Sequence, residues 1–118
     1  MRPASRRLRI DGPAGSIECA VDEPAAGGSR GVALVAHPHP LFGGSLDNKV
    51  AQTLARAFVE LGYAAWRPNF RGVGASEGAH DEGRGEVDDL AAVLRHAGAT
   101  RPVLAGFSFG AAVQTRLA

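Results

Sequence analysis

The segment that most constrains how this chain can fold is Gly-Phe-Ser-Phe-Gly at residues 106–110. It follows an apolar run at residues 102–105 and precedes small residues at 111–113, which favour a helix. A serine between a strand and a helix in this pattern lies on a very sharp turn, where flanking side chains would collide with neighbouring backbone. The segment therefore predicts a strand, a sharp turn and a helix, and it explains glycine at Gly106 and Gly110.

Length and composition describe an ordinary small globular chain. The 118 residues suffice for at most one small domain, and 45% hydrophobic and 21% charged residues are usual for such a fold. The formal net charge of +1 gives no reason to expect a nucleic acid or another polyanion as partner. No apolar run approaches the ~20 residues of a membrane span, and none follows the basic N-terminus as in a signal peptide. We therefore expect a cytoplasmic protein without a membrane or nucleic-acid partner.

Five segments are expected to form strands. Residues 8–11 and 16–21 alternate apolar and polar side chains across a Gly/Pro turn, which is typical of an antiparallel hairpin. Residues 31–36 are continuously apolar, as in a strand covered on both faces, and 63–66 and 103–107 are further short apolar runs.

Helices are expected between the later strands and after the sharp turn. Apolar side chains recur at helical spacing over residues 50–61, where Ser45 or Asp47 is placed to cap the start and Gly62 to end the helix. A second helix is expected from residue 86 to a glycine at 98. The order of these elements predicts an α/β fold, with a mostly parallel central sheet, an N-terminal antiparallel hairpin and helices on both faces.

Two loops interrupt this pattern. Residues 37–44 read His-Pro-His-Pro-Leu-Phe-Gly-Gly, and their prolines and glycines exclude regular secondary structure. Residues 69–85 form a glycine-rich loop, whose Gly-x-Gly at 72–74 lacks the spacing and the adjacent helix of a dinucleotide-binding loop. We interpret it as a structural loop beside a pocket, with no bound cofactor. The polar residues at 80–82, His-Asp-Glu, are interpreted as a solvated loop tip rather than a metal site.

Ser108 is the candidate nucleophile of the chain. A serine hydroxyl needs an adjacent base, an acid that orients this base, and N–H donors that stabilise an oxyanion. One donor would be the backbone N–H that follows the serine, here that of Phe109, and another would come from the loop at 37–44. The alternative is that Ser108 only caps a helix after a glycine-rich turn.

The choice of the second oxyanion donor is narrowed by the two prolines of the 37–44 loop. Proline has no backbone N–H, which leaves His39, Leu41 or Phe42 as candidates for the oxyanion hole. Alternatively, His-Pro-His-Pro is only a rigid turn in which both histidines bond backbone groups. The two interpretations are compatible, because a preorganised donor needs a rigid backbone.

The motifs occur in an order that resembles a known family. His-Pro-His-Pro-Leu-x-Gly-Gly at 37–44 is followed by Asp-Asn-Lys-Val at 47–50, Asn-Phe-Arg-Gly-Val-Gly-x-Ser at 69–76 and Gly-Phe-Ser-Phe-Gly at 106–110. This series resembles small bacterial members of the α/β-hydrolase superfamily, which are described as esterase-like or dienelactone-hydrolase-like. The resemblance implies a sheet with strand order 1-2-4-3-5 and a nucleophile elbow at 106–110.

The resemblance also implies the chemistry of the site. Ser108 would form an acyl-enzyme with a small-molecule carboxylic ester, thioester or amide, and Phe109 and His39 would be the oxyanion donors, with no cofactor and no metal. In this superfamily the triad acid and histidine follow the serine along the chain. Residues 109–118 contain neither, and all four histidines precede Ser108. A dyad of Ser108 with His37 or His39 would be a poor substitute.

The chain is therefore expected to be one partial α/β-hydrolase domain over residues 1–118. It would contain the first five strands and three helices, end just after the nucleophile elbow and have no measurable hydrolytic activity alone. The alternative is a non-catalytic interaction module, or a degenerate hydrolase fragment, that pairs or self-associates through the open strand edge at 103–107.

Overall fold

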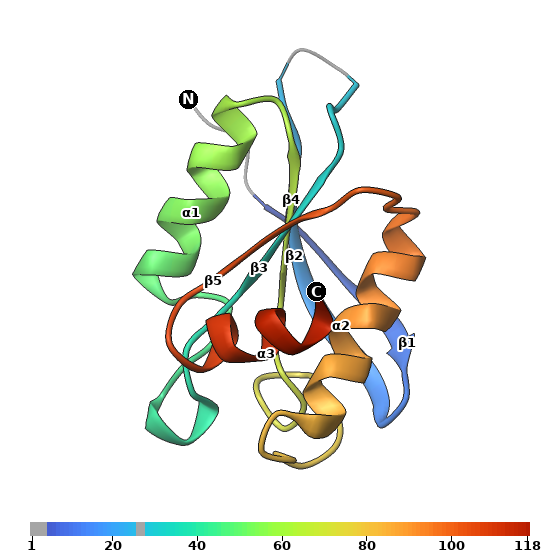
Figure 1. The fold of residues 1–118 in the computed structure, drawn as a ribbon, viewed down its shortest axis with the longest axis vertical. Helices are drawn as coiled ribbons and strands as arrows, with labels where there is room; N and C mark the ends of the chain where they lie inside the picture. The colour runs from blue at the N-terminus through green and yellow to red at the C-terminus, as the bar shows by residue number, and fades with distance from the viewer. Residues whose placement is uncertain (1–4, 26–27) are drawn as a thin grey trace.

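Five strands form a single mixed sheet in a computed structural model that describes residues 5–25 and 28–118. The start of the basic N-terminus, residues 1–4, lies outside the described residues. The strand order β1-β2-β4-β3-β5 confirms the order that the family resemblance implied. The strands are β1 (Arg6–Gly12), β2 (Gly15–Asp22), β3 (Val32–Ala36), β4 (Ala64–Pro68) and β5 (Val103–Gly106). The helices are α1 (Lys49–Glu60), α2 (Arg84–Ala97) and α3 (Phe109–Leu117), shown in Figure 1.

The sheet combines a hairpin with three parallel strands. β1 and β2 pair antiparallel, with Gly12 opposite Gly15 at the turn, and β2 also pairs antiparallel with β4. β3 pairs in parallel with β4 on one side and with β5 on the other. Within the described part of the chain β5 has β3 as its only neighbour, so it is an edge strand.

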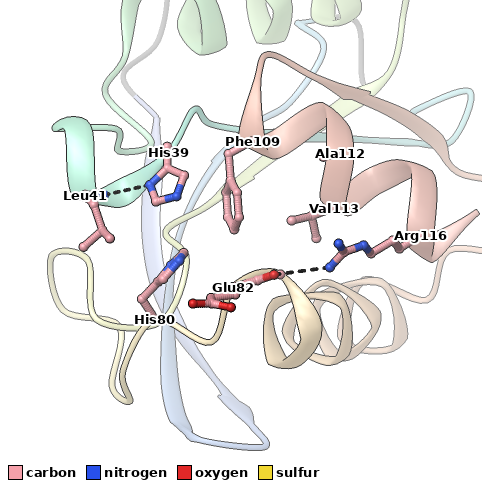
Figure 2. Close-up of a pocket in the computed structure, with 9 residues that line it drawn as sticks. His39, Leu41, His80, Glu82, Phe109, Ala112, Val113 and Arg116 are labelled. Carbon is pink, nitrogen blue, oxygen red and sulfur yellow. Dashed lines mark hydrogen bonds between the residues drawn. The ribbon is translucent and has the colours of Figure 1, made fainter.

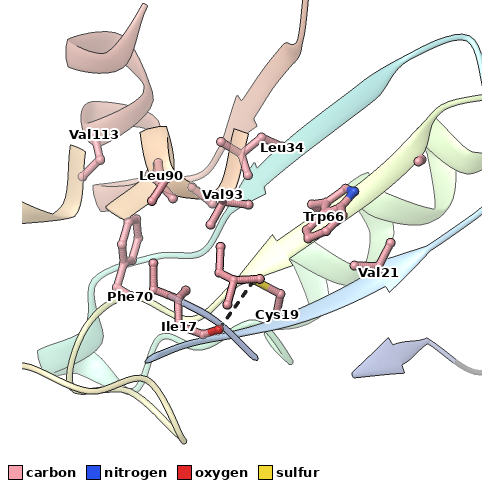
Figure 3. Close-up of a cluster of buried hydrophobic side chains, with 13 residues drawn as sticks. Ile17, Cys19, Val21, Leu34, Trp66, Phe70, Leu90, Val93 and Val113 are labelled. Carbon is pink, nitrogen blue, oxygen red and sulfur yellow. Dashed lines mark hydrogen bonds between the residues drawn. The ribbon is translucent and has the colours of Figure 1, made fainter. Parts of the chain in front are cut away.

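Helices cover both faces of the sheet, as the continuous apolar run of β3 predicted. On one face Val35 packs with Ala51 and Ala55 of α1. On the other face Leu34 belongs to a larger cluster beneath α2 and α3 (Figure 3). This larger cluster includes Ile17, Cys19, Val21, Trp66, Phe70, Leu90, Val93 and Val113. Because successive side chains of a strand point to opposite faces, β3 must be apolar at every position.

The start of α1 differs from the sequence expectation. Asn48 caps the helix, because its Oδ1 accepts hydrogen bonds from the N–H groups of Val50 (2.9 Å) and Ala51 (3.2 Å). Neither Ser45 nor Asp47 is the cap. The Ser45 hydroxyl instead accepts from the N–H of Asp47 at 3.2 Å, in the turn before the helix.

The start of α2 and the 37–44 loop also differ from the expectation. α2 begins at Arg84, two residues before Glu86, because Asp81 accepts a hydrogen bond from the N–H of Gly85 at 2.9 Å. The 37–44 loop contains one 3-10 turn, Pro40–Phe42, although no regular structure was expected there. Proline is tolerated at the start of this turn, since the N–H it lacks would have no partner within the turn.

The glycine-rich loop after β4 is held to the hairpin by a polar network, which confirms its structural role. The Glu18 carboxylate accepts hydrogen bonds from the Asn69 side chain at 2.7 Å and from the N–H of Ala75 at 3.0 Å. Gly74 has a φ of 54°, and a Cβ there would lie 2.5 Å from side-chain atoms of both Asn69 and Glu18, so a side chain would disturb this network. None of the helices in residues 5–25 and 28–118 is long and apolar enough to cross a membrane.

Candidate active site

The turn between β5 and α3 holds Ser108 in a conformation that non-glycine residues rarely adopt. Its backbone angles are φ 58° and ψ −118°, and its side chain is exposed. Such strain persists only where the surrounding structure enforces it, and it clusters at functional sites. The turn lies beyond the carboxyl end of a parallel strand, which is where open α/β sheets bind their ligands.

Gly106 and Gly110 leave no space for a side chain on either side of Ser108. A Cβ on Gly106 would lie 2.7 Å from the backbone N of Ala111 at the start of α3. A Cβ on Gly110 would lie 2.3 Å from the carbonyl oxygen of Ala36, at the end of β3. Both neighbours are backbone atoms, which cannot rotate away. The first turn of α3 therefore packs directly on the strand that precedes the 37–44 loop.

A polar side chain of α3 fixes the helix in this place. Gln114 donates hydrogen bonds from Nε2 to the carbonyl oxygens of Leu34 (2.8 Å) and Ala105 (2.9 Å). These carbonyls belong to β3 and β5, so a single buried amide joins α3 to both strands. No pattern in the sequence indicated this role, because a glutamine in a short helix is usually exposed.

Two of the four N–H groups considered as oxyanion donors have no acceptor among the described residues. One is that of Phe109, at the first position of α3, where a helix leaves its N–H groups free. The other is that of His39 in the 37–44 loop. The N–H of Leu41 donates to Nδ1 of His39 at 3.1 Å, and the N–H of Phe42 donates to the carbonyl of His39 at 3.1 Å. Of the three candidate loop donors, His39 is thus the one with a free N–H.

The side chains of His39 and Phe109 meet beside a pocket of about 380 Å³ (Figure 2). Their ring centroids lie 4.7 Å apart. The remaining residues that line the pocket come from the 37–44 loop, the loop after β4, and α3: Leu41, His80, Glu82, Gly83, Ala112, Val113 and Arg116. The side chain of Arg116 reaches across to the carbonyl of Glu82, at 3.3 Å.

His80 was expected on a solvated loop tip, and the structure corrects this expectation. Its side chain is only 16% exposed, and Nδ1 lies 3.2 Å from Oε2 of the fully buried Glu86. Its ring lies near those of His39 and Phe109, at 4.8 and 5.3 Å. Glu82 is exposed, as a loop tip should be. The contacts of His80 join three separate segments, so no local pattern could indicate them.

His37 cannot act as a base for Ser108. It is fully buried, its Nε2 accepts a hydrogen bond from the N–H of Phe70 at 3.0 Å, and its Nδ1 lies 2.7 Å from the carbonyl of Pro38. These partners require the proton on Nδ1. Burial lowers the pKa of His37 from 6.5 to about 4, so the ring is neutral. His37 therefore joins the end of β3 to the loop after β4.

No metal centre is formed by the described residues. In 5–25 and 28–118, no three His, Cys, Asp or Glu side chains gather closely enough to hold a metal ion. For chemistry, the site offers an exposed serine on a strained turn, the free N–H groups of Phe109 and His39, and the pocket that the side chains of these two residues line.

Known proteins share this architecture. A family model described as the alpha/beta hydrolase fold matches residues 39–118. An α/β serine hydrolase homologue from Coxiella burnetii is 43% identical, with a TM-score of 0.89, and the match covers 99% of this chain and 58% of that one. An α/β serine hydrolase without a lid from Xanthomonas campestris is also 43% identical, with a TM-score of 0.86 over 99% and 56% of the two chains.

A curated relative is similar to this chain to the same extent as these two solved structures. An uncharacterized protein from Rickettsia prowazekii is 40% identical over 116 residues, covering 94% of this chain and 48% of the relative. The chain thus spans about half the length of the proteins that it matches. The family model covers more than half of the chain and includes the Ser108 turn. By sequence and by fold, the chain belongs to the α/β-hydrolase family.

Proposed function

We propose that Ser108 is the nucleophile of a serine hydrolase that acts on a carboxylic ester, thioester or amide. The observation that carries this proposal is the strained backbone of Ser108, held between two glycines whose Cβ positions are occupied by backbone. A serine that merely caps a helix needs no such strain, and Ser108 makes no side-chain capping bond to α3. The relatives described as serine hydrolases support the same interpretation.

The proposed chemistry is acyl transfer in two steps. Ser108 Oγ attacks the carbonyl carbon and gives its proton to a base, while the carbonyl π electrons move onto oxygen. The N–H groups of Phe109 and His39 stabilise this oxyanion. The intermediate then expels the alcohol, thiol or amine, which takes the proton from the base. Water attacks the acyl-enzyme in the same way, releases the carboxylic acid and restores the serine.

The base for Ser108 must come from another residue than His37. In α/β-hydrolases the acid and the histidine follow the serine along the chain, and residues 109–118 contain neither. We propose that both correspond to the second half of the relatives, which are about twice as long. The 118 residues alone then hydrolyse no p-nitrophenyl ester at a measurable rate. Turnover by these residues that Ser108→Ala abolishes would overturn this part of the proposal.

Turnover of p-nitrophenyl acetate by the protein as its gene encodes it tests the proposed function. We expect Ser108→Ala to lower kcat by about 10³-fold or more, because the acyl-enzyme cannot form. The matched control is Ser29→Ala, an exposed serine between β2 and β3, at the opposite end of the parallel strands. Hydrolysis that persists in Ser108→Ala would contradict the assignment of the nucleophile.

A second proposal rests on the edge position of β5, whose other side is free in the described residues. An apolar parallel strand with one unpaired side can pair with a second copy of the chain. Light scattering of the isolated 118 residues would then show a dimer. The dimer fraction should rise with protein concentration, and a monomeric wild-type chain would contradict self-association.

A further inference from the structure

Three rings from three separate segments meet at the carboxyl end of the parallel strands. His39 belongs to the loop after β3, Phe109 to the first turn of α3, and His80 to the loop between β4 and α2. The ring centroids lie 4.7 Å apart for His39 and Phe109, 4.8 Å for His39 and His80, and 5.3 Å for His80 and Phe109. Each ring therefore contacts the other two, as Figure 2 shows.

His80 is the ring that the rest of the fold holds in place. Its Nδ1 lies 3.2 Å from the carboxylate of Glu86, outside the direction of a hydrogen bond, so the ring lies directly against this buried side chain. Glu86 is itself fixed, because its oxygens accept the N–H groups of Asp81 (2.8 Å) and Gly83 (3.0 Å). The position of His80 is thus tied to the start of α2.

The other two rings belong to the residues that carry the free N–H groups. These donors lie on different elements, which the pairing of β3 with β5 and the packing of Gly110 on Ala36 bring together. The rings of His39 and Phe109 also pack on each other, and His80 closes the third side of this contact. An oxyanion hole is sensitive to such placement, since a displacement of ~1 Å can cost about 100-fold in rate.

We propose that His80, anchored on Glu86, is a positioning residue that holds the His39 and Phe109 N–H groups at the spacing needed to bind an oxyanion. This inference rests on the proposed serine hydrolase function. His80 acts through its ring, which fills the space beside the other two rings, and it takes no proton from the substrate.

Kinetics of His80→Ala in the protein as its gene encodes it tests this role. The oxyanion exists only along the reaction path, so a loosened hole lowers kcat and leaves KM nearly unchanged. We expect kcat for p-nitrophenyl acetate to fall about 10- to 100-fold. His80→Phe keeps a ring of similar size and should recover most of this loss. Assays are run well below the thermal midpoint of each variant, so that all variants are folded.

The matched control is His96→Ala. His96 is an exposed histidine at the end of α2 whose ring contacts Trp66, with centroids 5.9 Å apart, so it is remote from the three rings. This variant should keep the wild-type kcat. Backbone amide resonances provide a readout independent of turnover. The signals of His39 and Phe109 should shift in His80→Ala, return toward their wild-type positions in His80→Phe and stay in place in His96→Ala.

The two proposals fail in different ways. A wild-type protein without turnover, or Ser108→Ala with wild-type turnover, overturns the proposed function. Where both behave as proposed, an unchanged kcat in His80→Ala overturns the positioning role. Failure of His80→Phe to recover kcat, or stationary His39 and Phe109 amides in His80→Ala, overturns it as well.

Discussion

At the scale of single residues, the site depends on positions where only one residue type fits. Ser108 has a positive φ, and its flanking glycines face backbone atoms closer than any side chain allows. The sequence predicted this turn correctly, because the two glycines of Gly-x-Ser-x-Gly are needed where a side chain would collide with neighbouring backbone. It did not predict which loop N–H is free. That distinction depends on hydrogen bonds that Leu41 and Phe42 make within their own loop.

Gly110→Ala should destabilise the fold by steric overlap alone. The added Cβ would lie 2.3 Å from the carbonyl oxygen of Ala36, and overpacking against immobile atoms costs about 3 kcal/mol. Urea unfolding measures the loss. The control is Gly98→Ala, where φ is 69° and no atom lies within 4 Å, so only backbone strain of about 1 kcal/mol is expected. Equal losses in the two variants would contradict the packing of α3 on β3.

His37 should make the fold less stable in acid. Its pKa is about 4 in the fold and 6.5 when unfolded, so the unfolded chain binds the additional proton. The neutral His37 ring therefore adds to the free energy of unfolding fully above pH 6.5. As the pH falls toward 4, the free energy of unfolding decreases by about 3 kcal/mol. Urea unfolding at several pH values should show this slope in the wild type and a shallower one in His37→Gln. Parallel slopes would show that His37 is not buried in its neutral form.

At the scale of elements, periodicity predicted the helices and strands, and tertiary contacts determined their ends. The apolar face of α1 could be predicted from its spacing, but the two caps expected from the sequence, Ser45 and Asp47, were both wrong. The structure selects Asn48, whose side chain reaches two N–H groups. Similarly, α2 starts earlier than expected because Asp81 and Glu86 bind N–H groups at its start.

Asn48→Ala should cost about 1 kcal/mol of stability, because the first turn of α1 loses its acceptor. Asp47→Ala should cost less. The Asp47 carboxylate makes only an exposed ion pair with Arg7 at 2.9 Å, and such pairs contribute little. Thermal or urea unfolding of the two variants gives the comparison. A larger loss of stability in Asp47→Ala than in Asn48→Ala would show that Asp47, not Asn48, caps α1.

At the scale of the whole molecule, the chain contains the elements that place the proposed nucleophile and its proposed oxyanion donors. β3 and β5 are parallel neighbours, so the 37–44 loop and the Ser108 turn both lie at the carboxyl end of the strands. Strand order and family followed from the sequence, because the ordered motifs are specific. The ring contacts of His80 and the hydrogen bonds of Gln114 did not, since they join segments far apart in the chain.

The most direct test of the central claim is covalent labelling by an alkyl fluorophosphonate, which bonds to an activated serine oxygen with loss of fluoride. The protein as its gene encodes it is treated with the probe, digested and analysed by mass spectrometry. The label should appear on the peptide that contains Ser108, persist in Ser29→Ala and be absent from Ser108→Ala. A protein that carries no label at Ser108, or carries it only on other residues, would contradict the assignment of Ser108 as the nucleophile.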